Sequence, residues 1–172
     1  MLFFIFNMRI IKLIPILFIL AACRTPSPQL ISFYVSEGVI QHFISPTMWT
    51  STTDKNTRAK LDITYRTGVE TPATVNVSFY GNKITPKDVS NVSLQGAEFE
   101  CKLNVLYVIF VEQTSNELRI SFSADRDDLV DMLEMEPVIT LKADIDGTSY
   151  TFTPEKHFYT LRDNFLILAL QY

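Results

Sequence analysis

The sequence predicts an all-β fold, a single two-sheet antiparallel β-sandwich with one short helix near residues 125–135. Three observations predict it: runs of alternating apolar and polar residues recur along the chain, turn residues separate them, and only one segment has helical spacing. Alternation of this kind is typical of strands with one buried and one solvated face. Since no Cys…Trp…Cys pattern is present, the predicted sandwich is immunoglobulin-like only in the loose sense.

The alternating runs identify the expected core face of each strand. Their apolar members are Ala59, Leu61, Ile63 and Tyr65; Val75, Val77 and Phe79; Leu118, Ile120 and Phe122; and Ile139, Leu141, Ala143 and Ile145. A further run, AEFECKLNV, places Cys101 in phase with Phe99 and Leu103, so we expect Cys101 to be a small core hydrophobe. Whether residues 91–100 form a strand or a loop stays open.

Two hairpins are expected. In KADIDGTSYTF, Asp146 and Gly147 separate two alternating runs, which predicts a tight type I′ turn. The runs VLYVIFVEQ and ELRISFS predict a second hairpin.

The expected helix spans residues 125–135, DRDDLVDMLEM. Leu129, Met132 and Leu133 share one helical face, Ser123 is placed to cap the N-terminus, and Pro137 follows the end. We expect this helix to cross from one sheet to the other.

The C-terminal run NFLILALQY supports a rival architecture. It alternates up to a terminal aromatic residue and resembles the last strand of outer-membrane β-barrels, of which an eight-stranded example fits about 150 residues. However, Ile167 and Ala169 make the run apolar on both faces. We therefore favour residues 165–170 as a central strand of the sandwich, covered on both sides.

The N-terminal segment has the features of a secretory leader. From Met8 it reads as a basic start, MRIIK, an apolar stretch, LIPILFIL, and small residues before Cys23, with either Met1 or Met8 as the start. Leu20-Ala21-Ala22-Cys23 resembles the lipobox of bacterial lipoproteins. That resemblance implies cleavage after residue 22 and lipidation of Cys23.

The resemblance also implies a domain organisation and a location. Residues 1–22 are the expected signal peptide, 23–29 the lipidated cysteine and an extended tether, and 30–172 the β-sandwich domain. Membrane attachment through the N-terminal lipid follows. Because the residue after Cys23 is Arg24 rather than aspartate, the resemblance favours the outer membrane, without indicating which face.

The composition argues against nucleic acid as a partner. The chain has 15 basic and 19 acidic residues, for a formal charge of −4, and loses Arg9 and Lys12 with the leader. Phosphate backbones would be repelled by this acidic balance.

No pattern in the sequence indicates catalysis, a metal or a cofactor. His42 and His157 stand far apart without a ligand motif, and no GxSxG elbow or glycine-rich phosphate loop is present. The acidic residues between 125 and 136 fail the EF-hand spacing, because Val130 occupies the glycine position, so a solvated helix face is favoured over a cation site.

The segment SPTMWTSTTDKN, residues 45–56, contains the candidate ligand contacts, Met48 and Trp49. An exposed indole in such a loop can stack on a sugar ring. A tryptophan at a strand end more often folds back over the end of a sandwich, and that arrangement is favoured here.

The sequence thus predicts a membrane-anchored envelope lipoprotein that acts as a non-catalytic binding or assembly component with an unidentified envelope protein. The alternatives are a module that binds carbohydrate or peptidoglycan through the Trp49 loop, a small outer-membrane β-barrel, and an envelope hydrolase that uses clustered carboxylates.

Overall fold

The computed structural model describes residues 28–81, 84–112 and 116–169. The strands and helices within these ranges are, in order, β1 (Leu30–Ser36), β2 (Val39–Ser51), β3 (Arg58–Thr67), β4 (Ala73–Tyr80), η1 (Pro86–Asp88), β5 (Val89–Gln95), β6 (Glu100–Glu112), β7 (Glu117–Ala124), α2 (Arg126–Met135), β8 (Thr140–Ile145), β9 (Thr148–Pro154) and α3 (Lys156–Ala169).

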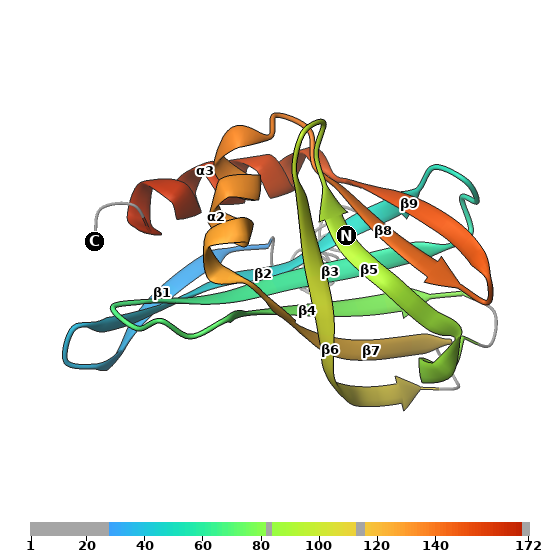
Figure 1. Ribbon diagram of the computed structural model, residues 1–172, viewed down its shortest axis with the longest axis horizontal. Helices are drawn as coiled ribbons and strands as arrows, with labels where there is room; N and C mark the ends of the chain where they lie inside the picture. Colours follow the sequence, from blue (N-terminus) through green and yellow to red (C-terminus); the bar gives the residue numbers. More distant parts are fainter. Residues whose placement is uncertain (1–27, 82–83, 113–115, 170–172) are drawn as a thin grey trace, which may run out of the picture.

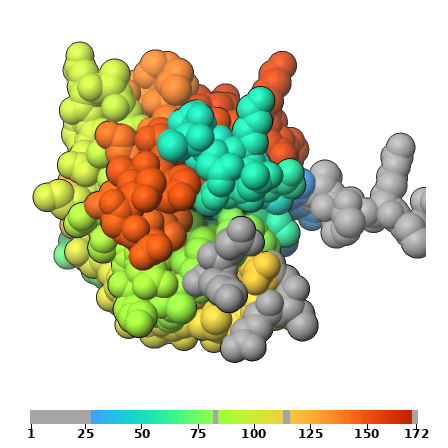
Figure 2. All heavy atoms as spheres, turned by 90° about the vertical axis from the view of Figure 1, so that its right-hand side faces the viewer, coloured from blue at the N-terminus to red at the C-terminus, as the bar shows by residue number. Residues whose placement is uncertain are grey.

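The strands form a closed antiparallel barrel, so the prediction of a two-sheet, immunoglobulin-like sandwich is wrong (Figure 1). Eight strands follow one another around the ring in the order β2-β3-β4-β7-β6-β5-β8-β9, and β1 adds to the outer edge of β2 as a hairpin. The ring closes where the end of β2 pairs with β9, at Trp49↔Pro154, Thr50↔Thr153 and Ser51↔Phe152. Figure 2 faces the end of the barrel where the β2–β3 connection lies beside the β8–β9 hairpin.

The predicted alternation of buried and exposed residues along the strands is confirmed, and the buried side chains fill the interior of the barrel. The buried residues include Leu61 and Ile63 on β3, Val75 and Val77 on β4, and Ile120 and Phe122 on β7, all 2% exposed or less. Cys101 is also fully buried, as predicted. Polar residues such as Lys60, Asn76 and Lys142 occupy the alternate positions of their strands.

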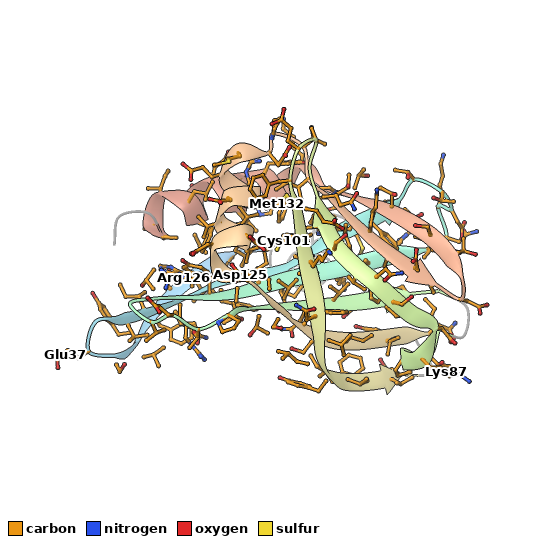
Figure 3. The ribbon with its side chains drawn as sticks, viewed as in Figure 1. Glu37, Lys87, Cys101, Asp125, Arg126 and Met132 are labelled. Carbon is orange, nitrogen blue, oxygen red and sulfur yellow. The ribbon has the colours of Figure 1, made fainter. Side chains whose placement is uncertain are left out.

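Helix α2 confirms the helix predicted near residues 125–135, but it is not the only one, since α3 is a second helix. Its buried residues are Leu129, Met132 and Leu133, as the spacing predicted. The cap is Asp125 rather than Ser123, since the Asp125 carboxylate accepts hydrogen bonds from the backbone N–H groups of Asp127 and Asp128, at 3.0 and 3.1 Å. The helix connects β7 to β8 and packs against β6, where Met132 and Cys101 lie near each other in Figure 3.

The C-terminal segment is a helix, so the central strand predicted at residues 165–170 is wrong over its described part. Helix α3 extends from Lys156 to Ala169 and lies across β2 and β1 on the same side of the sheet as α2 (Figure 1). Its buried residues are Phe158, Leu161, Phe165 and Ala169, spaced by three or four. That spacing is helical, and the apolar alternation at the end of the segment concealed it.

Both predicted hairpins are present. Asp146 and Gly147 join β8 to β9 with φ angles of 50° and 71°, the left-handed conformation that a type I′ turn requires at both positions. Strand β6 pairs with β7 from Leu103↔Ala124 to Glu112↔Glu117. The open question about residues 91–100 is also answered: β5 ends at Gln95, and a short connection leads to β6 at Glu100.

Candidate functional site

Strand β6 leaves the barrel wall along more than half of its length. It pairs with β5 only at Ser93↔Lys102, Leu94↔Cys101 and Gln95↔Glu100. Beyond Leu103 its only partner strand in the described chain is β7. In Figure 1, β5 and β6 spread apart below the connection that they share. One edge of β6 is therefore without a neighbouring strand, and we call residues 105–111 the open β6 segment.

Seven consecutive large apolar residues make up the open β6 segment, and all are exposed. The fractions are 60% for Val105, 50% for Leu106, 59% for Tyr107, 40% each for Val108, Ile109 and Phe110, and 48% for Val111. Exposed apolar residues scattered singly are normal on a protein surface, whereas a continuous patch marks an interaction site or an aggregation hazard. The open β6 segment is a patch of this second kind.

Two bulges decide which apolar side chains of β6 lie opposite which residues of β7. The register against β7 shifts between Val105 and Tyr107 and again between Val108 and Phe110. As a result, Val105, Val108 and Val111 lie opposite the core residues of β7, and Tyr107 and Phe110 lie opposite Ser121 and Arg119. Bulges also strengthen the local twist of a strand, a common feature of sheet edges.

A cleft opens where β5 and β6 separate. Its volume is ≈ 340 Å³, and its lining residues are Asn91, Val92, Ser93, Glu100, Lys102, Leu103, Asn104 and Val105. Asn91 adopts a positive φ of 49°, and the pairing of β5 with β8 is irregular between Ser90 and Ser93. The cleft joins the open β6 segment at Val105, so the two form one continuous surface.

Polar side chains on β3, β4 and β7 pair with one another in a network. Asp62 is 1% exposed and forms an ion pair with Arg119 of β7. The same carboxylate accepts a hydrogen bond from Asn76 Nδ2 at 2.8 Å, and Arg119 Nη1 donates to Ser78 Oγ at 2.9 Å. Because its charges are paired within the sheet, this network holds β3, β4 and β7 together across their outer surface.

The candidate ligand contacts predicted from sequence do not form an exposed loop. Residues 45–51 belong to β2, and Trp49 is fully buried. Its ring lies edge-on to Phe158 at 4.9 Å, and its indole N–H donates to Thr47 Oγ1 at 3.0 Å. Met48 is half-buried. The indole is thus a core group that joins α3 to the barrel, and in this conformation a sugar ring cannot reach it.

The histidines and Cys101 have separate structural surroundings. His42 lies beneath α3 with its Nδ1 2.8 Å from Ser32 Oγ, and burial lowers its pKa. His157 Nε2 lies 2.9 Å from the carbonyl oxygen of Pro28. Burial raises the pKa of the Cys101 thiol to about 12, with the Asp128 and Asp125 carboxylates adding to the effect. A protonated, buried thiol is a poor nucleophile.

The carboxylates mostly serve local structure. Glu136 is 3% exposed, and its side chain accepts hydrogen bonds from the backbone N–H groups of Ala97, Glu98 and Phe99, at 2.8 to 2.9 Å. These donors, chiefly Ala97 and Glu98, lower its pKa. A side chain on Gly96 would collide with it, because an added Cβ would lie 2.0 Å from Glu136 Cδ.

Two further clefts are lined by acidic residues. One, of ≈ 450 Å³, lies beside the N-terminus of α2 and includes Asp125 and Arg126 (Figure 3). Its arginine is already engaged, since Nε donates to Tyr65 Oη at 2.8 Å. The other, of ≈ 290 Å³, includes Asp54 and Asp88, which both accept hydrogen bonds within their own loops. Among the residues that the structure describes, no group of carboxylates, histidines and cysteines is arranged to hold a metal ion.

No family model, curated protein or solved structure matches this chain. None of the helices in the described ranges is long and apolar enough to span a bilayer. Cys23 and the lipobox lie outside those ranges, so lipidation stays a prediction.

Proposed function

We propose that this protein is a lipid-anchored component of the bacterial envelope, with a barrel that binds another protein without catalysing a reaction. The binding element is the open β6 segment. One observation carries the proposal: seven successive apolar residues, each 40% to 60% exposed, lie on a strand edge that no other described strand covers.

The chemistry of the segment favours a protein as its partner. Tyrosine and phenylalanine supply large contact areas and are enriched at the centres of interfaces, where charged residues are depleted. Tyr107 and Phe110 are of this type, and the segment contains no charged residue. A strand edge also offers backbone N–H and C=O groups, so an extended chain can add to it as a further strand.

The leader supports the location. If Cys23 carries the lipid, residues 24–27 provide a tether of about 12 Å. Pro28 and Gln29 already contact the barrel, since the Pro28 carbonyl lies 2.9 Å from His157 Nε2 and the Gln29 carbonyl accepts from the Ser45 backbone N–H at 2.9 Å. The tether would hold the barrel close to the membrane surface. Polar residues at the outward positions of β3, β4 and β8 suit a barrel that stands in water on such a tether, since a membrane-inserted barrel needs an apolar outer band.

Site-specific photo-crosslinking in intact cells tests the binding element. A benzophenone amino acid replaces Ile109 in the full-length chain, and a matched control carries it at Ile167 of α3, which is 59% exposed. We expect a covalent adduct with a protein from position 109 and none from position 167. If both positions yield the same products, or position 109 yields none, the open β6 segment is not the binding element.

A separate measurement tests the anchor. Cells fed labelled palmitate should label the chain, and Cys23→Ser should abolish the label. An unlabelled parent chain would remove the anchor from the proposal and leave the binding element untouched.

A further inference from the structure

We propose that the partner of the open β6 segment is the same segment of a second copy of this chain. The two copies pair as antiparallel strands about a two-fold axis near Val108. The inference rests on the proposed function in one respect, the assignment of the open β6 segment as the binding element, and it goes further by identifying the occupant.

The open β6 segment is complementary to itself. The sequence VLYVIFV, reversed and laid against itself around Val108, pairs Val105 with Val111, Leu106 with Phe110, and Tyr107 with Ile109. Every pair joins apolar side chains, two of them aromatic with aliphatic, the kind of cross-strand pair that stabilises sheets. Like charges opposite each other would oppose self-pairing, and the segment contains none.

An isologous pairing also closes the contact. The open edge of β6 lies in the barrel wall, where β5 pairs with β6 at only three positions. A two-fold dimer covers both copies of the open β6 segment in one contact and leaves neither copy of the segment free for a third chain. Both copies carry the same bulges, at Val105/Tyr107 and Val108/Phe110, and therefore the same twist. A two-fold axis matches these twists, whereas a flat strand from another protein would have to adapt to them.

The size of the exposed surface suits a dimer. Aromatic side chains offer about 150–250 Å² each and the aliphatic ones lie near the lower value, so seven residues at 40% to 60% exposure present roughly 500–700 Å² per copy. A contact that covered all of this surface on both copies would bury at most roughly 1,000–1,400 Å², which is in the range of the ~1,000 Å² expected of a specific interface. A patch of this size also lies at or above the upper limit of ~300–600 Å² that soluble monomers expose.

Cysteine scanning in cells tests the symmetry directly. Single substitutions Tyr107→Cys, Val108→Cys and Ile109→Cys are made in the full-length chain, and disulfides are promoted with a mild oxidant. On a two-fold axis, a residue faces its own copy with Cα atoms ~4.5–5.5 Å apart, which a disulfide can bridge. Three residues from the axis, the copies of one residue are separated by about 20 Å.

The extent of disulfide crosslinking should therefore depend on the position of the cysteine along the segment. A band at twice the chain mass should peak within positions 107–109 and be lost for Val105→Cys and Val111→Cys. The parent chain is the background control, because its Cys101 is buried. Val138→Cys is the surface control, since Val138 is 61% exposed and lies in the α2–β8 connection, outside the open β6 segment. Equal crosslinking at every position, or none at any, overturns the inference.

A second measurement does not depend on introduced cysteines. The detergent-extracted full chain should sediment as a dimer, and Phe110→Lys should convert it to a monomer with unchanged circular dichroism. A parent chain that is monomeric at micromolar concentration also overturns the inference. If Ile109 crosslinks to a different protein while the cysteine scan is blank, the proposed binding element stands and the second copy is wrong.

Discussion

Helix α3 allows a sharp test of the tertiary structure, because a strand and a helix predict opposite results for two neighbouring substitutions. Residues two apart face the same side of a strand but nearly opposite sides of a helix. Phe165 is fully buried, with its ring 5.3 Å from that of Tyr65 and 6.0 Å from that of His42. Ile167 is 59% exposed. Phe165→Ala and Ile167→Ala should therefore differ greatly in their effect on stability.

The size of the difference follows from burial. Truncating a fully buried phenylalanine to alanine costs about 3–5 kcal/mol, because transfer energy is lost and a cavity remains. The substitution of Ile167 changes a mostly solvated side chain and should stay within ~0.5 kcal/mol. The higher helix propensity of alanine contributes a few tenths of a kcal/mol in its favour.

Urea unfolding of a chain that starts at Arg24, followed by tryptophan fluorescence, measures both effects. Trp49 is the only tryptophan and packs against Phe158 of the same helix, so its emission reports the docking of α3. For m-values of about 1–3 kcal/mol/M, Phe165→Ala should lower the urea midpoint by roughly 2 M, and Ile167→Ala should leave it nearly unchanged. Similar losses for the two variants would refute the helix and its docking.

Three further predictions follow from the buried polar groups. Glu136→Gln should destabilise the fold at pH 7. Because the pKa of Glu136 is lower in the folded chain than in the unfolded chain, its carboxylate stabilises the fold above pH ~4.5, and this stabilisation is lost as the pH falls through the folded pKa. The gap in urea midpoint between the two proteins should then close in acid, and a gap independent of pH would contradict this account. Asp62→Ala should cost about 2–4 kcal/mol by leaving Arg119 unpaired, and a double-mutant cycle with Arg119→Met should recover part of that loss; strict additivity would show that the pair is not coupled. In a chain that lacks Cys23, the Cys101 thiol should resist iodoacetamide at pH 8 until urea unfolds the protein, and rapid labelling in the folded state would show that the thiol is accessible.

Local patterns predicted the elements well wherever one periodicity stood alone. The alternation around Leu61 and Ile120 identified strands and their buried faces, and Asp146-Gly147 identified its turn. Residues 156–169 were harder, because their last part alternates like a strand while Phe158, Leu161 and Phe165 repeat like a helix. Short apolar runs fit both periods, and packing against Trp49 and Tyr65 decided between them.

The sequence could not predict the candidate site, for a related reason. A run such as VLYVIFV is typical of a strand buried on both faces. Its exposure arises because β5 turns away after three pairs with β6, and nothing within residues 105–111 specifies where a neighbouring strand leaves. For Trp49 the sequence favoured a covered indole over an exposed one, and the tertiary structure supplied what covers it, Phe158 of α3.

By itself the sequence determined which residues avoid water on each strand and where the chain turns, while its lipobox-like leader stays a prediction. Only the tertiary structure decided that the strands close into a barrel, that the C-terminal segment lies over it as a helix, and that part of β6 stays uncovered. The physical reason is that alternation and turn chemistry act between neighbours in the chain. Closure depends on pairing between residues about a hundred positions apart, such as Trp49 and Pro154.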